Sequence, residues 1–248
     1  MNQSLAGKKV LITGVGLKDV RHVFRDVLSG EPSHTSVLVE GIEYKASIGA
    51  ATALACARAG AETVIVARSE GCLRAVIQWI KREVPDASVR YGLYDLANKR
   101  ALKDLVAYVN AFSTDKRLYW VQSLGLGAGT VTVPGDNPYQ LIGNISADLI
   151  SAELSVLTST VGLLQHLLPY FKKQEESRVC IVSSMSAIRS FASGGIHNAA
   201  KGALSRFANA AAIELAPKGI YVTDIRPGAV DTGLYDSEEV QNAVANIA

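Results

Sequence analysis

The feature that most constrains the fold of this chain is a repeated alternation of short β-branched runs with longer amphipathic stretches. Runs such as residues 10–13 and 63–67 are apolar on both sides and lack the every-second-residue alternation of a half-exposed strand. Strands of this kind lie in parallel sheets that helices cover on both faces. The pattern therefore predicts an α/β fold, a doubly wound parallel sheet in three αβα layers, with a ligand at the carboxyl ends of the strands.

The predicted elements alternate from the first strand to the last. The expected strands cover residues 10–13, 63–67, 88–91, 118–122, 178–183 and 220–225. The expected helices cover residues 48–59, 72–84, 99–112, 147–172 and 198–215. Because α/β folds of this size are commonly single units, we expect residues 1–248 to form one domain.

One segment, residues 15–46, interrupts the alternation between the first strand and the helix that should follow it closely. It contains a basic and apolar stretch at 18–28, a turn-like stretch at 29–33 and a strand-like stretch at 35–39. A connection of this length is a functional excursion or a disordered loop. Since it begins where the ligand is expected, we hypothesise a lid or an arm beside that ligand; an obstruction of the site is the alternative.

The charge balance and the cysteines limit the class of protein. The chain carries 25 Lys and Arg residues against 23 Asp and Glu residues, whereas nucleic-acid-binding surfaces need clustered excess base. Cys56, Cys72 and Cys180 cannot all pair with one another, and they lack metal-ligand spacing. We therefore expect no nucleic-acid partner and free thiols in a reducing cytoplasm. No metal site is expected either, because no carboxylate or cysteine is suitably spaced from His22, His34 or His166.

Neither a secretory signal nor a membrane span is expected. Residues 1–9 lack the apolar core of a signal sequence. The most apolar region, residues 48–67, is interrupted by Arg58, Gly60 and Glu62 before it is long enough to cross a bilayer. These observations favour a soluble protein without a membrane partner.

The junction between the first strand and its helix has the residues that a phosphate site needs. Thr13-Gly14 ends the strand and Ser47-Ile48-Gly49 opens the helix. A pyrophosphate site requires a tight turn, close approach of the backbone and free amide groups at a helix N-terminus. Ser47 is also suited to cap the helix and to donate its hydroxyl to phosphate. Taken alone, Thr-Gly more often marks only a turn.

Further landmarks follow in a fixed order along the chain. Arg68 ends the second strand, Asp95 follows the third, Ser184 follows the fifth, Lys201 lies on the next helix, and Pro227-Gly228 follows the last strand. Together with Thr13-Gly14 they resemble the short-chain dehydrogenase/reductase family, whose glycine motif is TGxxxGxG. Ser47 stands where the middle glycine of that motif would be. The resemblance implies a Rossmann-like dinucleotide-binding domain with an insertion at 15–46.

The resemblance implies NADP(H) as the cofactor. An acidic residue at the position of Arg68 would bind the ribose 2′-hydroxyl of NAD, whereas a basic residue pairs with the 2′-phosphate of NADP. Asp95 resembles the aspartate that contacts the adenine amino group. The alternatives are a solvated arginine at a strand end and an aspartate that caps a helix.

Two more segments match cofactor-binding motifs of the family. Gly125 is the residue kept from the NNAG motif, and residues 227–232 match PGxVxT, which implies that Val230 and Thr232 hold the nicotinamide carboxamide. The implied cofactor-binding residues are Thr13, Gly14, Ser47, Ile48, Gly49, Arg68, Asp95, Gly125, Pro227, Gly228, Val230 and Thr232.

The catalytic positions depart from the family pattern. The family uses Asn, Ser, Tyr and Lys, with Tyr and Lys four residues apart on one helix face. Here His197 replaces the tyrosine, Lys201 is kept, and Ser184 lies 13 residues before His197 at the usual serine position. The asparagine position falls on Val156. Ser184, His197 and Lys201 are the candidate catalytic residues; the alternative is that His197 only begins a helix and faces solvent.

Histidine changes how a proton is supplied during carbonyl reduction. Tyrosine donates it in the family, and histidine can also donate a proton. However, a lysine cation one turn away disfavours the imidazolium, so we expect a neutral ring that offers an N–H hydrogen bond, with Ser184 as a second donor. Valine at 156 removes an anchor of the proton relay. The predicted site is an altered one.

The leading hypothesis is an NADP(H)-dependent short-chain oxidoreductase that reduces a carbonyl group of a small molecule. One alternative is a catalytically silent relative that binds a nucleotide or regulates a partner. Another is a different reaction on the same fold, such as double-bond reduction or a non-redox acid–base step.

The resemblance also implies self-association. In the family, the helices that match 147–172 and 198–215 pack against a second subunit as a four-helix bundle. We therefore expect a homodimer or homotetramer; the alternative is that the long apolar faces of these helices pack only internally. Family members usually continue through another helix and strand, whereas this sequence ends at Ala248.

Overall fold

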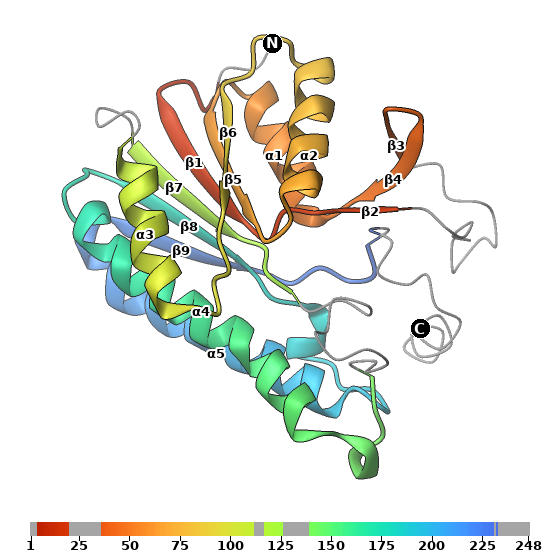
Figure 1. Ribbon diagram of the computed structural model, residues 1–248. Coiled ribbons are helices and arrows are strands. Elements are labelled where there is room, and N and C mark those ends of the chain that lie inside the picture. Colours follow the sequence, from red (N-terminus) through yellow and green to blue (C-terminus); the bar gives the residue numbers. More distant parts are fainter. Residues whose placement is uncertain (1–3, 20–35, 112–116, 126–138, 231, 233–248) are drawn as a thin grey trace.

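The central feature of the structure is a parallel sheet of six strands in the order β6-β5-β1-β7-β8-β9 (Figure 1). The computed structural model describes residues 4–19, 36–111, 117–125, 139–230 and 232. The strand order reverses its direction of winding between β1 and β7, as in a doubly wound sheet. The predicted fold class is confirmed. The strands are β1 (Lys8–Thr13), β5 (Glu62–Ala67), β6 (Val89–Leu93), β7 (Arg117–Gln122), β8 (Ser177–Val182) and β9 (Ile220–Ile225).

Helices cover both faces of this sheet (Figure 1). Consecutive residues of β1 show the two sides, because Leu11 packs in one buried cluster and Ile12 in the other. The Leu11 cluster contains α3 (Lys99–Asn110), α4 (Ala147–Phe171) and α5 (Gly195–Leu215), whereas the Ile12 cluster contains α1 (Ile48–Arg58) and α2 (Glu70–Glu83). The three short 3₁₀ helices are η1 (Ile142–Asn144), η2 (Met185–Ala187) and η3 (Ala216–Lys218).

The described part of the insertion forms a small antiparallel sheet in the order β2-β4-β3. Its strands are β2 (Leu17–Asp19), β3 (Ser36–Val39) and β4 (Ile42–Ala46). Glu40 and Gly41 both have positive φ, 51° and 80°, as a tight two-residue hairpin turn requires. Val37 and Val39 are buried in the cluster that contains α1 and α2. The sheet is therefore anchored to the outside of the fold by its own apolar residues.

The strand expected at 35–39 is β3, whereas β2 and β4 are not among the predicted elements. Their sequences, LKD and IEYKA, contain charged residues that interrupt the apolar run expected of a buried strand. Most of the predicted basic stretch at 18–28 and the whole turn-like stretch at 29–33 lie outside the described residues.

Helix α4 is the described helix that is long and apolar enough to cross a membrane by length and composition alone. The most apolar region of the sequence is residues 48–67, but in the structure this region contains α1 and β5. Helix α4 contacts both α3 and α5, and its Leu163, Leu167 and Phe171 are fully buried in the main core. Its apolar character is explained by this packing.

Candidate functional site

A cavity of about 700 Å³ lies at the carboxyl ends of the central strands, where the strand order reverses. It is the place where doubly wound sheets bind their ligands. Thr13 and Gly49 are not among the residues on its wall. The predicted site residues that line the cavity are Gly14, Ser47, Ile48, Arg68, Asp95, Gly125, Ser184, His197, Lys201, Pro227, Gly228, Val230 and Thr232.

The turn after β1 is built from glycines that leave no room for side chains. Gly14 has a φ of +84°, and a Cβ on it would lie 2.3 Å from the carbonyl oxygen of Ser123. A Cβ on Gly49 would lie 2.6 Å from the carbonyl oxygen of Gly14. The two parts of the interrupted motif therefore pack directly against each other, backbone on backbone. Thr13 is fully buried and accepts a hydrogen bond from Trp120 Nε1 at 3.2 Å, so its side chain supports the turn from behind.

Ser47 closes the insertion and opens α1. Its Oγ accepts hydrogen bonds from the backbone amides of Gly16 at 2.9 Å and Ala50 at 3.1 Å. Its hydroxyl proton remains available to donate to another group, since both contacts use Oγ as an acceptor. Helix geometry also gives the first amides of α1, those of Ile48 and Gly49, no partner within the helix. Ser47 and Ile48 line the cavity, and Gly49 follows them directly in α1, so this helix N-terminus fits a pyrophosphate.

The outer end of the cavity carries Arg68, directly after β5. Arg68 is exposed and forms no ion pair within the part of the chain that the structure describes. Asp95 is also exposed, and its Oδ1 accepts a hydrogen bond from the amide of Ala97 at 3.1 Å. The helix that follows is capped by Asn98 instead. Asp95 thus stabilises its own turn while one side of it faces the cavity.

The inner end of the cavity holds a buried cluster of charged and polar side chains. His197 Nδ1 lies 3.1 Å from Glu153 Oε1, and both side chains are buried. Lys201, one turn further along α5, is also buried, and burial lowers the pKa of its ammonium group while the carboxylate of Glu153 acts in the opposite direction. A Cβ on Gly125 would lie 3.6 Å from Lys201 Nζ. His197 therefore does not face solvent.

Glu153 is the site residue that sequence reasoning missed. The sequence predicts that the asparagine position of the family falls on Val156, and Val156 does line the cavity. The polar side chain of α4 that contacts His197 is instead Glu153, one turn earlier in the helix. A signal was present: Leu149, Glu153 and Val156 share one buried face of α4, so a carboxylate stands within an apolar stripe. Such a carboxylate needs a partner, and His197 supplies one.

Ser184 begins η2 at the end of β8. Its Oγ donates to Ser186 Oγ at 3.1 Å and accepts from the Ser186 amide at 3.1 Å. The amide of Met185 donates to the carbonyl oxygen of Pro227 at 2.8 Å, which joins this turn to the segment after β9. The serine and the predicted carboxamide-binding segment are therefore held side by side.

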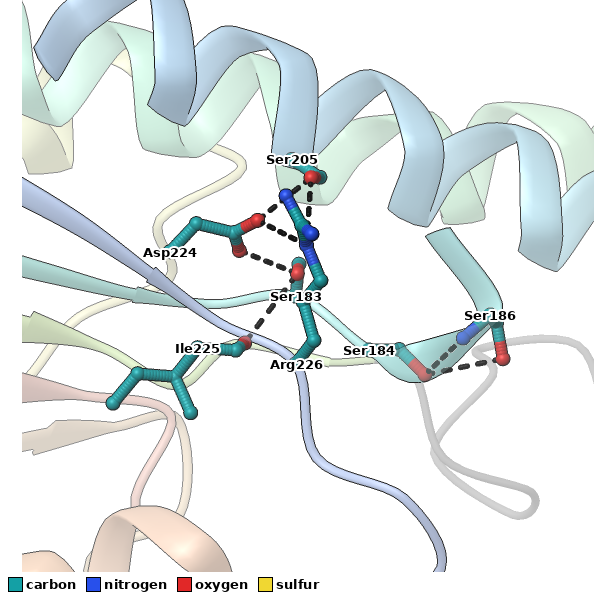
Figure 2. Close-up of polar contacts among 7 residues, drawn as sticks. All are labelled: Ser183, Ser184, Ser186, Ser205, Asp224, Ile225 and Arg226. Carbon is teal, nitrogen blue, oxygen red and sulfur yellow. Dashed lines mark hydrogen bonds and ion pairs between the residues drawn. The ribbon is translucent and has the colours of Figure 1, made fainter. Parts of the chain in front are cut away.

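A partly buried polar network centred on Asp224 supports this junction (Figure 2). Its carboxylate accepts hydrogen bonds from Ser183 at 2.5 Å, Ser205 at 2.6 Å and Arg226 Nε at 2.7 Å. Burial, the largest single effect, opposes ionisation of Asp224, but these hydrogen bonds outweigh it and hold the pKa of the carboxyl below its usual value. The network ties β8, β9 and α5 together beneath the site.

Metal chemistry has no support from the residues that the structure describes, because they form no group of three His, Cys, Asp or Glu side chains able to hold an ion. Cys56, Cys72 and Cys180 are free. Burial raises the pKa of Cys56 and of Cys180 to about 11, so neither is a reactive thiolate at neutral pH.

Comparison with known proteins decides the family. The profile of the short chain dehydrogenases matches residues 37–243, most of the chain. The chain belongs to the short-chain dehydrogenase family. Its members are oxidoreductases that bind a nicotinamide cofactor. The match begins within the insertion of this short-chain dehydrogenase, so β1 and Gly14 lie outside it.

Individual relatives of this short-chain dehydrogenase are distant. The 3beta-hydroxysteroid dehydrogenase of Mediterraneibacter gnavus is 28% identical over 230 residues, which are 91% of this chain and 77% of that protein. A shorter match, 34% identical over 79 residues, covers 32% of this chain and 31% of the uncharacterized oxidoreductase YxjF of Bacillus subtilis. Among solved structures, an NADPH-bound short chain oxidoreductase from Pseudomonas aeruginosa, described as containing an atypical catalytic center, has a TM-score of 0.72 at 19% identity and covers 93% of this chain and 74% of its own. At that identity the likeness shows the fold alone.

Proposed function

We propose that this protein is an NADP(H)-dependent oxidoreductase that reduces a carbonyl group of a small molecule, with His197 in place of the usual tyrosine. The observation that carries the proposal is one cavity whose wall includes both the exposed Arg68 and the buried pair His197 and Lys201. A cavity of about 700 Å³ is large enough for a nucleotide and a small substrate.

The choice of nucleotide is inferred from the hydrogen-bond donors that would bind its phosphate groups. The amides of Ile48 and Gly49 and the hydroxyl of Ser47 would hold the pyrophosphate. The guanidinium of Arg68 would pair with a 2′-phosphate, because its planar fork of N–H groups matches phosphate oxygens. The NADPH described for the Pseudomonas neighbour supports this choice of nucleotide. Asp95, Gly125, Pro227, Gly228, Val230 and Thr232 would complete the binding surface.

At the reacting end, bound NADPH would supply a hydride to the carbonyl carbon. His197 would protonate the oxygen as the negative charge develops there, and the hydroxyl of Ser184, once turned away from Ser186 Oγ, would donate a hydrogen bond to the same oxygen. Lys201 would bind the hydroxyl groups of the nicotinamide ribose. Each of these side chains lines the cavity.

The experiment that tests the proposal has two steps. NADPH and NADH are titrated against the protein by calorimetry, and a broad panel of carbonyl compounds is then screened for loss of NADPH absorbance. The His197→Ala variant should lower kcat by about 10²- to 10⁴-fold, the usual contribution of a general acid. His166→Ala, which changes an exposed histidine on α4, is the matched control.

The outcomes separate the competing functions. Saturable NADPH binding without turnover of any carbonyl, even after His197→Tyr, would favour a silent nucleotide-binding relative. Product masses separate carbonyl reduction from double-bond reduction or a non-redox step. Full activity of His197→Ala would remove the proposed acid.

We also propose that the protein forms a homodimer or homotetramer in the cytoplasm. Ile150 and Leu154, one turn apart on α4, and Ile213 on α5 are large apolar side chains exposed on the protein surface. The same helices carry the buried site on their inner faces, so assembly through their outer faces would stiffen the site.

A further inference from the structure

We propose that Glu153 is a positioning residue that fixes the orientation and the proton arrangement of His197, so that Nε2 of the ring is the atom that donates to the reacting oxygen. This inference rests on the proposed function and adds to it a group that the family pattern does not contain. It starts from the 3.1 Å contact between His197 Nδ1 and Glu153 Oε1, which joins α5 to α4 across 44 residues of sequence.

The contact determines which nitrogen carries the fixed proton. An ionised carboxylate can only accept, so Nδ1 of His197 must be the donor. In the neutral ring Nε2 is then the nitrogen without a proton, and in the imidazolium Nε2 carries the proton that can leave. The ring is also held in place by Tyr139, whose ring meets it edge-on with the centroids 5.4 Å apart. Position and tautomer are therefore both set before a substrate binds.

The charges around the ring come from two elements. Lys201, on the same helix as His197, disfavours a second positive charge, and Glu153 on α4 compensates it. Tyr139 adds an aromatic edge, and Ser184 at the end of β8 and the exposed Arg189 line the same cavity. The carboxylate of Glu153, within hydrogen-bonding distance of the ring, has the opposite sign to the ammonium group of Lys201.

The proton step would balance with His197, bound NADPH and solvent. The carbonyl carbon would accept a hydride, with its two electrons, from the nucleotide, the carbon–oxygen π bond would break, and the oxygen would take the proton from Nε2 of the His197 imidazolium. The ring would then be neutral, with Nδ1 still protonated and donating to Glu153 Oε1. Solvent would return a proton to Nε2 before the next turnover.

The first test is the pH dependence of kcat in three variants. Glu153→Gln removes the charge at constant size and should lower kcat by about 100-fold, with the fall of kcat at alkaline pH moved toward lower pH. Glu153→Asp keeps the charge and should keep the wild-type position of that fall. Asp148→Asn, an exposed carboxylate on the same helix, is the control and should match the wild type. A fall that stays in place in Glu153→Gln would overturn the proposal.

The second test does not depend on activity. ¹⁵N spectra of the histidine rings in the wild-type protein, with His197 assigned from the His197→Gln variant, should show a neutral ring protonated at Nδ1 at alkaline pH. A ring protonated at Nε2 would overturn the proposal, even if Glu153→Gln fails to fold. An Nδ1-protonated ring in a protein that reduces no carbonyl would instead refute the proposed function and leave the His197–Glu153 pair intact.

Discussion

Gly16 and Ser47, 31 residues apart in sequence, are joined by two hydrogen bonds of 2.9 Å: the Gly16 amide donates to Ser47 Oγ, and the Ser47 amide donates to the Gly16 carbonyl oxygen. The pair closes the insertion at its base. Leu17 and Ala46, the next residues on each side, are partners in the β2–β4 ladder. The glycine turn is thereby completed by residues from both sides of a long excursion.

The backbone contact at Gly14 predicts a strong effect of a single methyl group. Gly14→Ala should lower the free energy of unfolding by at least about 2 kcal/mol and weaken NADPH binding more than tenfold, because the Cβ would collide with the Ser123 carbonyl in a left-handed backbone. Thermal unfolding and calorimetry measure the two effects. Gly71→Ala, on α2 with open space around the position, is the control and should lose no stability. Equal behaviour of the two variants would contradict the turn geometry.

Replacing residues 18–45 by Asn-Gly should leave the nucleotide site intact and reduce stability. Leu17 and Ala46 would be joined by a tight hairpin turn, and the Gly16–Ser47 pair would remain. Burial of Val37 and Val39 would be lost, at about 1.5–3 kcal/mol each. NADPH affinity should change less than about threefold, within the range of an indirect effect.

Val39→Ala in the full-length chain is the control for this deletion, since it removes part of the same buried apolar surface while it keeps the insertion. A loss of NADPH affinity above tenfold in the deletion alone, without a loss of stability, would show instead that the insertion acts as a lid or arm over the nucleotide.

Arg68 should set the preference for a phosphorylated nucleotide. Arg68→Ala should raise the Kd of NADPH by about 10- to 100-fold through the loss of charge-assisted hydrogen bonds, and leave that of NADH unchanged. Arg58 is exposed, pairs with Glu83 of α2, and lies at the opposite end of α1 from the cavity-lining Ile48, so Arg58→Ala is the control. Equal weakening of both nucleotides would count against a 2′-phosphate contact.

The Asp224 network predicts a specific dependence of stability on pH. Because the pKa of this carboxyl is lowered in the folded state, its contribution to stability is complete above the usual carboxyl pKa of about 3.9 and is lost as the pH falls through the folded-state value. Asp224→Asn should therefore cost about 2 kcal/mol at pH 7, and less as the pH falls below about 4. Urea unfolding at both pH values measures this. Asp86→Asn, an exposed carboxylate, should show no such difference.

The proposed assembly predicts a dimer or tetramer in sedimentation at micromolar concentration. Leu154→Glu, on the outer face of α4, should shift the protein toward monomers by burying a charge at the interface. The same substitution at Leu38, exposed on β3, should leave the assembly unchanged. A monomeric wild-type protein would refute the proposed assembly.

The fold was predictable because its strands are apolar runs that need no information from elsewhere in the chain. The strand at 118–122 and the helix at 48–59, for example, agree with β7 and α1 to within one residue at each end. Strands β2 and β4 were not predicted because Lys18, Glu43 and Lys45 interrupt the apolar pattern that marks a strand.

The candidate site was predictable where its residues belong to local motifs, as with His197 and Lys201 on one helix face. Glu153 could not be placed by a motif, because its partner lies 44 residues away and only the packing of α4 against α5 brings the two together. Thr13 shows the converse case: a motif residue whose hydroxyl turns inward to Trp120 rather than toward the cavity.

The paired residues Leu17 and Ala46 mean that the excursion departs from the fold and returns to it at neighbouring points. Lengthening the chain between two such points has little effect on stability, since each doubling of the loop length adds only about 0.6 kcal/mol to the free energy of loop closure. The junction is therefore a suitable insertion site for another domain. A fluorescent protein domain whose own termini lie close together can be inserted there. Because this junction adjoins the turn at Gly14, the emission of the inserted domain would report on nucleotide binding if the proposed site is correct.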